Sequence, residues 1–131
     1  MLFRGMTPDV DGLPRVGRSA RSLGVRVPDD IKPDTSGVVH PGQGGLSVAP
    51  CSMWKLPHHR RPLPMGRGST GSARDCVYSL PFDRVPIELT ARPDPMQPFK
   101  HAFIEPGSSV VLEDYDNALA GTRTQWQRVW P

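Results

Sequence analysis

Two side chains in the last third of the chain have the types and the spacing for acid–base chemistry. The run from Lys100 to Glu105 reads as a β-strand, in which His101, Phe103 and Glu105 share one face. A histidine and a carboxylate on one face can act as base and acid, for example in metal-free cleavage of RNA. Such a histidine can also serve only to hydrogen-bond within the fold, so both interpretations stay open.

Arginine supplies most of the positive charge. Of the 16 basic residues 13 are Arg, and residues 1–75 carry 11 basic and 6 acidic side chains, whereas residues 76–131 carry 5 and 7. Because a guanidinium offers two parallel donors to a phosphate, the first part of the chain is suited to a phosphate-bearing ligand or a nucleic acid. The coding preference of a GC-rich genome would give the same excess of Arg, and the sequence alone does not separate the two explanations.

Cys51, His58, His59 and Cys76 have the side-chain types of a zinc site but not its spacing. Structural zinc usually draws its ligands from close pairs such as C-x₂-C, and here each cysteine stands alone. We therefore predict no structural metal. Two cysteines can form one disulfide or remain free, and we expect free thiols because a chain of 131 residues can fold without a cross-link.

Length and composition predict one domain over residues 1–131, because the chain is too short for two enzyme domains. The 16 Pro and 13 Gly predict many loops, while 37% hydrophobic residues and three Trp supply one core. No apolar run is long enough to cross a membrane or to form a signal peptide.

The longest predicted loop runs from Cys51 to Arg74 and is basic and rich in Pro and Gly. Ordinary connections are shorter, which makes this segment a candidate lid or binding loop. In a non-enzymatic interpretation, the stretch from Lys55 to Arg74 docks on an acidic partner or on RNA. Against RNA, only Trp54 is near enough to offer a ring on which a base could stack.

The remaining patterns predict an α+β fold. Apolar residues at helical spacing follow Ser109, a candidate N-cap, and continue to Gly121. Thr122 and Gln125 have capping-box spacing for a last helix that reaches Trp130. Strands are predicted at Leu2–Met6, Val25–Val27, Gly44–Pro50, Asp75–Leu80, Ile87–Ala91 and Lys100–Glu105, and one or two helical turns at Arg18–Leu23.

The order of these pieces resembles a known family. An aromatic-Arg first strand (Phe3-Arg4), a Gly-Gly-x-Ser-Val strand (Gly44 to Val48), a late strand with His101 before Ile104-Glu105-Pro106, and a closing helix are similar to small bacterial effector toxins of type VI secretion. The resemblance covers most of the chain. It implies a compact core of two small sheets in an ADP-ribosyltransferase-like arrangement, with C-terminal helices.

The resemblance also implies residue roles in the use of NAD as a substrate. In the wider superfamily the first strand supplies an Arg or His for the cofactor, a middle strand a Ser-rich motif and a late strand a catalytic Glu, and Arg4, Ser47 and Glu105 match these in order. The implied catalytic residues are Glu105, His101 and Ser47, and the implied NAD-binding residues are Arg4, Gly5, Gly44, Gly45, Ser47 and Tyr78.

The chemistry of NAD suits these residue types. Cleavage of the glycosidic bond develops positive charge on the ribose, which a carboxylate such as Glu105 stabilises. The guanidinium of Arg4 can hold the pyrophosphate. Because a chain terminus is normally frayed, we expect Arg4 to contribute to binding and not to stability.

Two departures from the superfamily motif keep other activities open. The second Glu or Gln that often stands two residues before the catalytic Glu is here Phe103, and the common Ser-Thr-Ser run is reduced to Ser47. Both favour NAD cleavage without a macromolecular acceptor as an alternative, beside a metal-free ribonuclease toxin. A toxin of this kind implies a cognate immunity protein, a protein or RNA acceptor, and action in the target-cell cytoplasm after secretion without a signal peptide.

Overall fold

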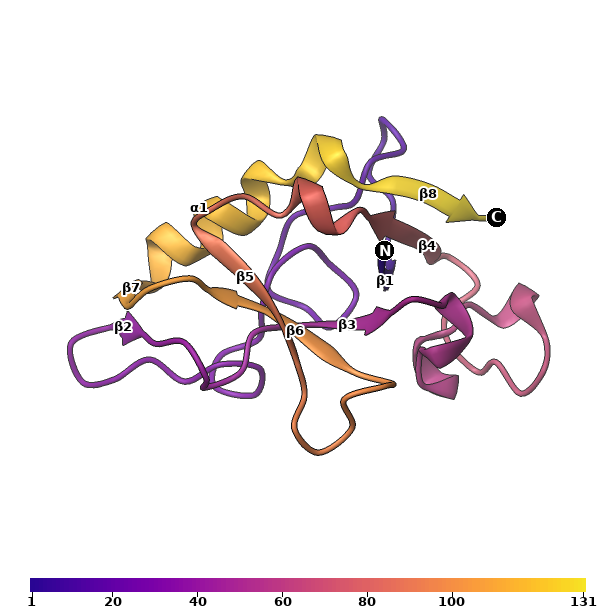
Figure 1. Ribbon diagram of the computed structural model, residues 1–131. Coiled ribbons are helices and arrows are strands. Elements are labelled where there is room, and N and C mark those ends of the chain that lie inside the picture. Colours follow the sequence, from indigo (N-terminus) through magenta and orange to yellow (C-terminus); the bar gives the residue numbers. More distant parts are fainter.

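The computed structural model describes residues 1–131, and its largest element is a six-stranded antiparallel sheet (Figure 1). The strand order is β5-β6-β3-β1-β4-β8. These strands are β1 (Leu2–Met6), β3 (Leu46–Pro50), β4 (Cys76–Leu80), β5 (Leu89–Pro93), β6 (Ala102–Pro106) and β8 (Gln127–Trp130). Two short strands, β2 (Val38–Val39) and β7 (Val110–Val111), form a separate antiparallel pair. The predicted α+β class is confirmed.

Strand β3 joins the two halves of the large sheet. Its first residues pair with β6, with Ser47 opposite Phe103, and its last residues pair with β1, with Ala49 opposite Phe3. The strands that carry Arg4, Ser47 and Glu105 are therefore direct neighbours.

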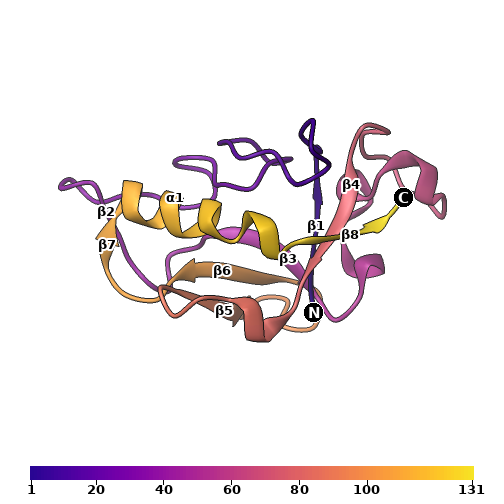
Figure 2. The ribbon, with the colours of Figure 1, turned by 90° about the horizontal axis from the view of Figure 1, so that it is seen from above.

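One face of the sheet is covered by the single α-helix, α1 (Leu112–Gly121), which Figure 2 shows from above. Tyr115 and Leu119 are buried in the main core with Leu46 and Ile104. The Tyr115 hydroxyl donates to the Ile104 carbonyl at 2.6 Å and accepts from the Leu46 N–H at 3.1 Å. These two hydrogen bonds tie α1 to the first residue of β3 and to the neighbouring strand β6. Burial of one such side chain stabilises the fold by roughly 1.5–3 kcal/mol.

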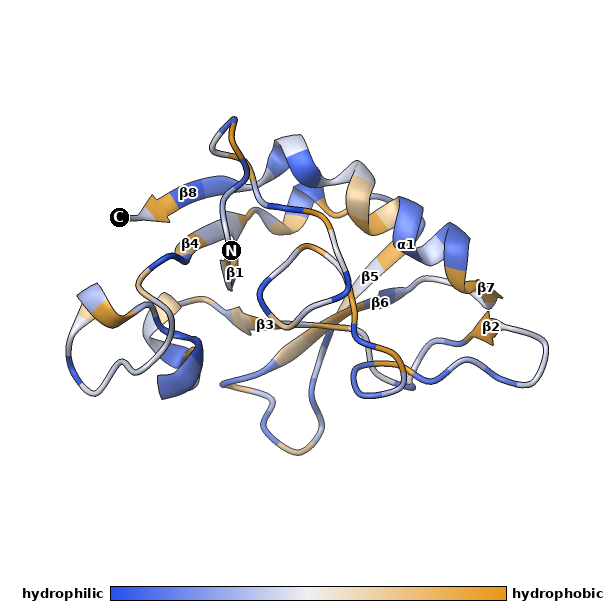
Figure 3. Ribbon diagram, turned by 180° about the vertical axis from the view of Figure 1, so that it is seen from behind, coloured by the Kyte–Doolittle hydropathy of each residue, from blue (hydrophilic) through white to orange (hydrophobic).

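The predicted long loop holds three 3₁₀-helices, η1 (Met53–Lys55), η2 (His58–Arg60) and η3 (Leu63–Met65). Leu56 and Met65 pack on Ala49 and Val77 in a second, smaller core. The segment is therefore anchored to the sheet, although the residues of η2, His58-His59-Arg60, are hydrophilic (Figure 3).

The end of the chain differs from the prediction. Residues 122–130 form no α-helix, but a 3₁₀-turn, η5 (Arg123–Gln125), and then β8 at the edge of β4. Thr122 does not open a helix, because its hydroxyl donates to the Leu119 carbonyl and accepts from the Trp126 indole N–H. Only one α-helix is present where C-terminal helices were expected.

Other local predictions are also wrong. Arg18–Leu23 and Val25–Val27 form turns and irregular structure. Ser109 does not cap α1, whose N-cap is Val111; its hydroxyl lies 2.7 Å from His40 Nδ1 instead. The strands predicted at Ile87 and Lys100 begin two residues later.

Both cysteines are free thiols, as predicted, with Cys51 exposed and Cys76 buried. No three His, Cys, Asp or Glu side chains gather where they could hold a metal ion. None of the helices is both long and apolar enough to cross a bilayer.

Candidate functional site

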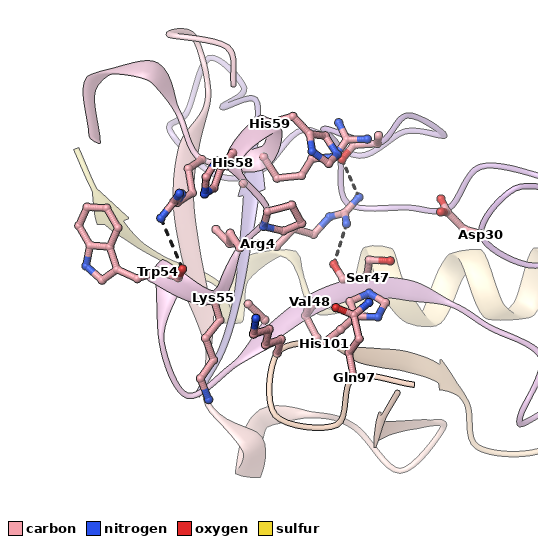
Figure 4. A pocket seen from close by; sticks show the side chains of 18 of the residues that line it. Arg4, Asp30, Ser47, Val48, Trp54, Lys55, His58, His59, Gln97 and His101 are labelled. Atoms are coloured by element: carbon pink, nitrogen blue, oxygen red, sulfur yellow. Dashed lines mark hydrogen bonds between the residues drawn. The ribbon is translucent and has the colours of Figure 1, made fainter. Parts of the chain in front are cut away.

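A cavity of about 580 Å³ is lined on one side by residues of β1 and β3 (Figure 4). Its volume lies in the range of small-molecule and cofactor sites. The wall opposite the strands is the segment from Trp54 to Arg61, and the connection between β5 and β6 closes one side. The lining residues are Arg4, Gly5, Ala20, Arg26, Asp30, Ser47 to Ala49, Trp54 to Arg61, Gln97, Lys100 and His101.

The cavity has a large excess of positive charge. Its cationic side chains are Arg4, Arg26, Lys55, Arg60, Arg61 and Lys100. Asp30 is the only carboxylate among the lining residues, and it already pairs with Arg26 at 3.0 Å. Field lines concentrate in a cleft lined by charges of one sign, so this cavity is suited to an anionic ligand.

Arg4 is buried at the back of the cavity and is also a structural cross-link. Its Nε and Nη2 donate to the Ser22 carbonyl at 3.1 and 2.9 Å, Nη2 also to Ala20, and Nη1 to the Ser47 carbonyl at 2.8 Å. Burial lowers the pKa of Arg4 to about 10, which leaves it charged at neutral pH. The expectation that Arg4 contributes little to stability is therefore wrong, because β1 is an interior strand and not a frayed terminus.

Arg60 is the cavity cation with the most donors to spare. Its half-buried guanidinium makes no hydrogen bond and no ion pair within the chain. Burial, and then the nearby charge of Arg26, lower the pKa of Arg60. Asp30 and Asp75 act in the opposite direction, and a bound phosphate would add its negative charge to theirs.

Ser47 and Gly5 both line the cavity. Ser47 lies on the face of β3 opposite to buried Leu46 and Val48. Gly5 has a packing reason to be glycine, because a Cβ there would lie 2.5 Å from the Arg60 carbonyl oxygen. The absence of a side chain on β1 lets the Arg60 segment approach closely.

His101 lines the cavity and has a partner outside it, Asp94, that the sequence did not reveal. His101 Nδ1 lies 2.7 Å from Asp94 Oδ2, and Nε2 makes no hydrogen bond. The bond with His101, followed by the Met96 N–H, holds the pKa of Asp94 below its ordinary value. An ionised Asp94 favours a proton on Nδ1, which leaves the Nε2 lone pair free to accept a proton.

Glu105 does not line the cavity. It lies further along the same face of β6 as Phe103, the residue opposite Ser47. Its Oε2 accepts from the Gly42 N–H at 2.7 Å and from Arg92 Nε at 2.9 Å, while Oε1 makes no hydrogen bond. The structure therefore brings Arg4, Ser47 and His101 together at the cavity and leaves Glu105, which is 3% exposed, outside the cavity lining.

Three further predicted site residues lie outside the cavity. Gly44 and Gly45 pack closely against neighbouring backbone. A Cβ at Gly44 would lie 2.2 Å from the Asp30 carbonyl oxygen, and a Cβ at Gly45 would lie 2.6 Å from the Ile104 carbonyl oxygen. Tyr78 is buried in the core, where its hydroxyl donates to the Gly12 carbonyl at 2.8 Å. Burial raises the pKa of Tyr78 to about 12.

The residues that the sequence did not single out are Arg60, Lys100 and Asp94. The basic composition of the loop after β3 indicates Arg60 as a candidate, but it does not indicate that the loop folds back over β1. The hairpin between β5 and β6 could have signalled Asp94, because its backbone N–H bonds to the His101 carbonyl across the turn.

The chain matches no protein-family model, no curated protein and no solved structure.

Proposed function

We propose that the protein is an antibacterial effector toxin of the type VI secretion kind that binds NAD in the basic cavity and transfers its ADP-ribose to a macromolecule of the target cell. Its sheet then has the ADP-ribosyltransferase-like arrangement, and the producing cell needs an immunity protein. The observation that carries the proposal is a cavity of about 580 Å³ with six cationic side chains and one carboxylate, which is itself neutralised by Arg26.

The neighbouring strands β6, β3 and β1 support the resemblance to this superfamily. Arg4, Ser47 and His101, which the motifs related only by their order along the sequence, line one cavity. Arg4 is largely committed to carbonyl groups, so Arg60 and Lys100 take the larger share of the pyrophosphate.

The reaction breaks the bond between the nicotinamide nitrogen and C1′ of the ribose. The electron pair leaves with nicotinamide, positive charge develops on the ribose, and a nucleophile of the acceptor bonds to C1′ and loses its proton. His101 is placed to take that proton on Nε2, with Asp94 holding the ring. Glu105 lies on β6 outside the cavity lining, where Arg92 and Gly42 hold Oε2, and Oε1, which makes no hydrogen bond, is the oxygen assigned to a ribose hydroxyl.

The direct test is to incubate the protein with NAD and to measure the release of nicotinamide and the transfer of labelled ADP-ribose to a bacterial extract. Wild-type protein should do both, and its expression in a bacterial cytoplasm should stop growth. Glu105→Gln should lose the activity and the toxicity while it still binds NAD. Glu113→Gln, an exposed position on α1, is the matched control. Full activity of a folded Glu105→Gln protein would remove Glu105 from the reaction.

A metal-free ribonuclease is the second candidate, and one observation favours it. His58 and His59 line the same cavity as His101, together with Lys55 and Lys100. Paired histidines beside cations can cleave RNA without a metal. RNA shortened in buffer without NAD, with NAD left intact, would reverse the order of the two proposals.

A further inference from the structure

We infer that Trp54 is the platform on which the adenine of the ligand stacks, so that NAD lies with its adenosine end against Trp54 and its nicotinamide end toward Ser47 and His101. The inference rests on the proposed function, since it gives the direction in which NAD would occupy the basic cavity. Figure 4 shows Trp54 at one end of the cavity and Asp30 at the other, with Arg4 and Ser47 between them.

Trp54 is the only Trp, Tyr or Phe among the residues that line the cavity. It is 36% exposed, whereas Trp126 is 2% exposed and lies in the main core. An indole in that position is not needed to fill the core. Its exposed ring lines a cavity of suitable size, and nucleobases stack on aromatic side chains of this kind.

Two guanidinium groups lie over the Trp54 ring, and they differ in burial and in hydrogen bonding. Arg61 is buried, lies 5.5 Å from the ring centroid and donates to the Trp54 and Arg67 carbonyls. Arg67 is exposed, lies 5.0 Å from the centroid and makes no side-chain hydrogen bond or ion pair. An arriving base can therefore displace Arg67, while Arg61 stays and holds the ring in place.

Arg61 also carries an unused donor at this end of the cavity. Its Nε is buried and has no hydrogen-bond partner, although the residue is only 6% exposed. Buried donors are nearly always satisfied in native proteins, and the chain itself supplies no acceptor for this one. The ring nitrogens of adenine and the oxygens of its ribose are acceptors of this type.

Charge decides which end of NAD lies here. The nicotinamide ring of NAD is a cation, and at Trp54 it would lie among the charges of Lys55, Arg61 and Arg67. The adenine ring is neutral and suffers no such repulsion. Away from Trp54, the cavity holds its only carboxylate, Asp30, which is paired with Arg26, and His101, whose Nδ1 lies 2.7 Å from Asp94 Oδ2 outside the lining.

The test is tryptophan fluorescence of the full chain, titrated with NAD, ADP-ribose, AMP and nicotinamide mononucleotide. Trp54→Phe identifies the signal of Trp54, because it removes one fluorophore and keeps a ring on which a base can stack. We expect NAD, ADP-ribose and AMP to quench Trp54, and nicotinamide mononucleotide not to. Trp54→Leu should weaken ADP-ribose binding about tenfold, the loss expected for one base–aromatic stack, and should leave nicotinamide mononucleotide unaffected.

The outcomes separate this inference from the proposed function. Quenching by nicotinamide mononucleotide but not by AMP, or equal ADP-ribose affinity in Trp54→Leu, would overturn the orientation and leave NAD binding intact. Failure of the wild-type protein to bind either NAD or ADP-ribose would overturn the proposed function itself. Arg67→Gln serves as the second variant, because loss of a displaceable guanidinium should leave AMP affinity equal or higher; a tenfold loss there would contradict the displacement.

Discussion

At the scale of single residues, the sequence predicted a ligand-binding role for Arg4 but not its structural role. The sequence places an Arg on the first strand, and the structure puts it in the wall of the cavity. In the structure the guanidinium also donates to three carbonyl groups, those of Ala20, Ser22 and Ser47. The sequence could not predict this, because Ala20 and Ser22 lie on an irregular segment without a periodic pattern.

Arg4→Lys should therefore destabilise the protein as well as weaken the ligand site. A Lys ammonium cannot reach all three carbonyls in the plane that a guanidinium spans, and a buried acceptor left without its donor is costly. We expect a loss of about 2 kcal/mol or more in the free energy of unfolding, measured by urea denaturation without ligand. Arg15→Lys, at an exposed position that makes no side-chain hydrogen bond, is the control and should change stability little. An unfolding midpoint equal to wild type in Arg4→Lys would show that the cross-link contributes nothing.

The variant Asp94→Asn tests the role of His101, whose ring Asp94 holds in place. The amide cannot favour a proton on His101 Nδ1 as the carboxylate does, so the rate of nicotinamide release should fall about tenfold or more with little change in NAD affinity. Asp114→Asn, exposed on α1, provides the matched control.

The pH profile gives a second readout of the same pair. Since the bond with His101 lowers the pKa of Asp94 in the folded protein, the stabilising effect of the pair is present above the ordinary Asp pKa and is lost as the pH falls through the lowered one. The unfolding free energy of wild type should therefore lose this contribution in acid, and that of Asp94→Asn should not. Parallel acid profiles for the two proteins would contradict the pairing.

At the scale of elements, strands were predicted better than helix ends. Short apolar runs bounded by Gly and Pro located β1, β3, β4, β5 and β6 within two residues. The segment after Gly121 differs from the prediction because Thr122 and Gln125 fit a capping box locally, while the free edge of β4 pairs with Gln127, Arg128 and Trp130. Local spacing cannot report an open sheet edge formed by a segment some fifty residues away, and tertiary pairing decided the outcome.

The start of β3 depends on a glycine that the sequence placed in the ligand site. In Gly45→Ala the new Cβ would lie 2.6 Å from the Ile104 carbonyl oxygen and 2.9 Å from the Tyr115 hydroxyl. The strand would have to move away from β6 and α1, so we expect a loss of about 3 kcal/mol in unfolding free energy, measured by thermal or chemical denaturation. Gly121→Ala meets nothing within 4 Å and should be neutral or slightly stabilising. Equal stability of the two variants would show that β3 and α1 are less tightly packed than described.

At the scale of the whole molecule, the front-loaded positive charge has a structural explanation. Of the six cationic residues that line the cavity, only Lys100 lies in the less basic part of the chain, after residue 75. The sequence indicated a phosphate-bearing ligand, but the coding preference of a genome explained the same Arg content equally well. The fold adds that four of the 13 Arg gather around one cavity with Lys55 and Lys100, while the other nine Arg lie elsewhere.

The most direct test of the central claim is a calorimetric titration of NAD into the intact protein at low and at high salt. We predict one saturable site per chain whose affinity falls as salt screens the cavity, and falls again by about tenfold in Arg60→Gln, which removes the cation with the most free donors. Absence of binding heat at millimolar NAD, or an affinity that neither salt nor Arg60→Gln changes, would contradict the assignment of the basic cavity as the NAD site.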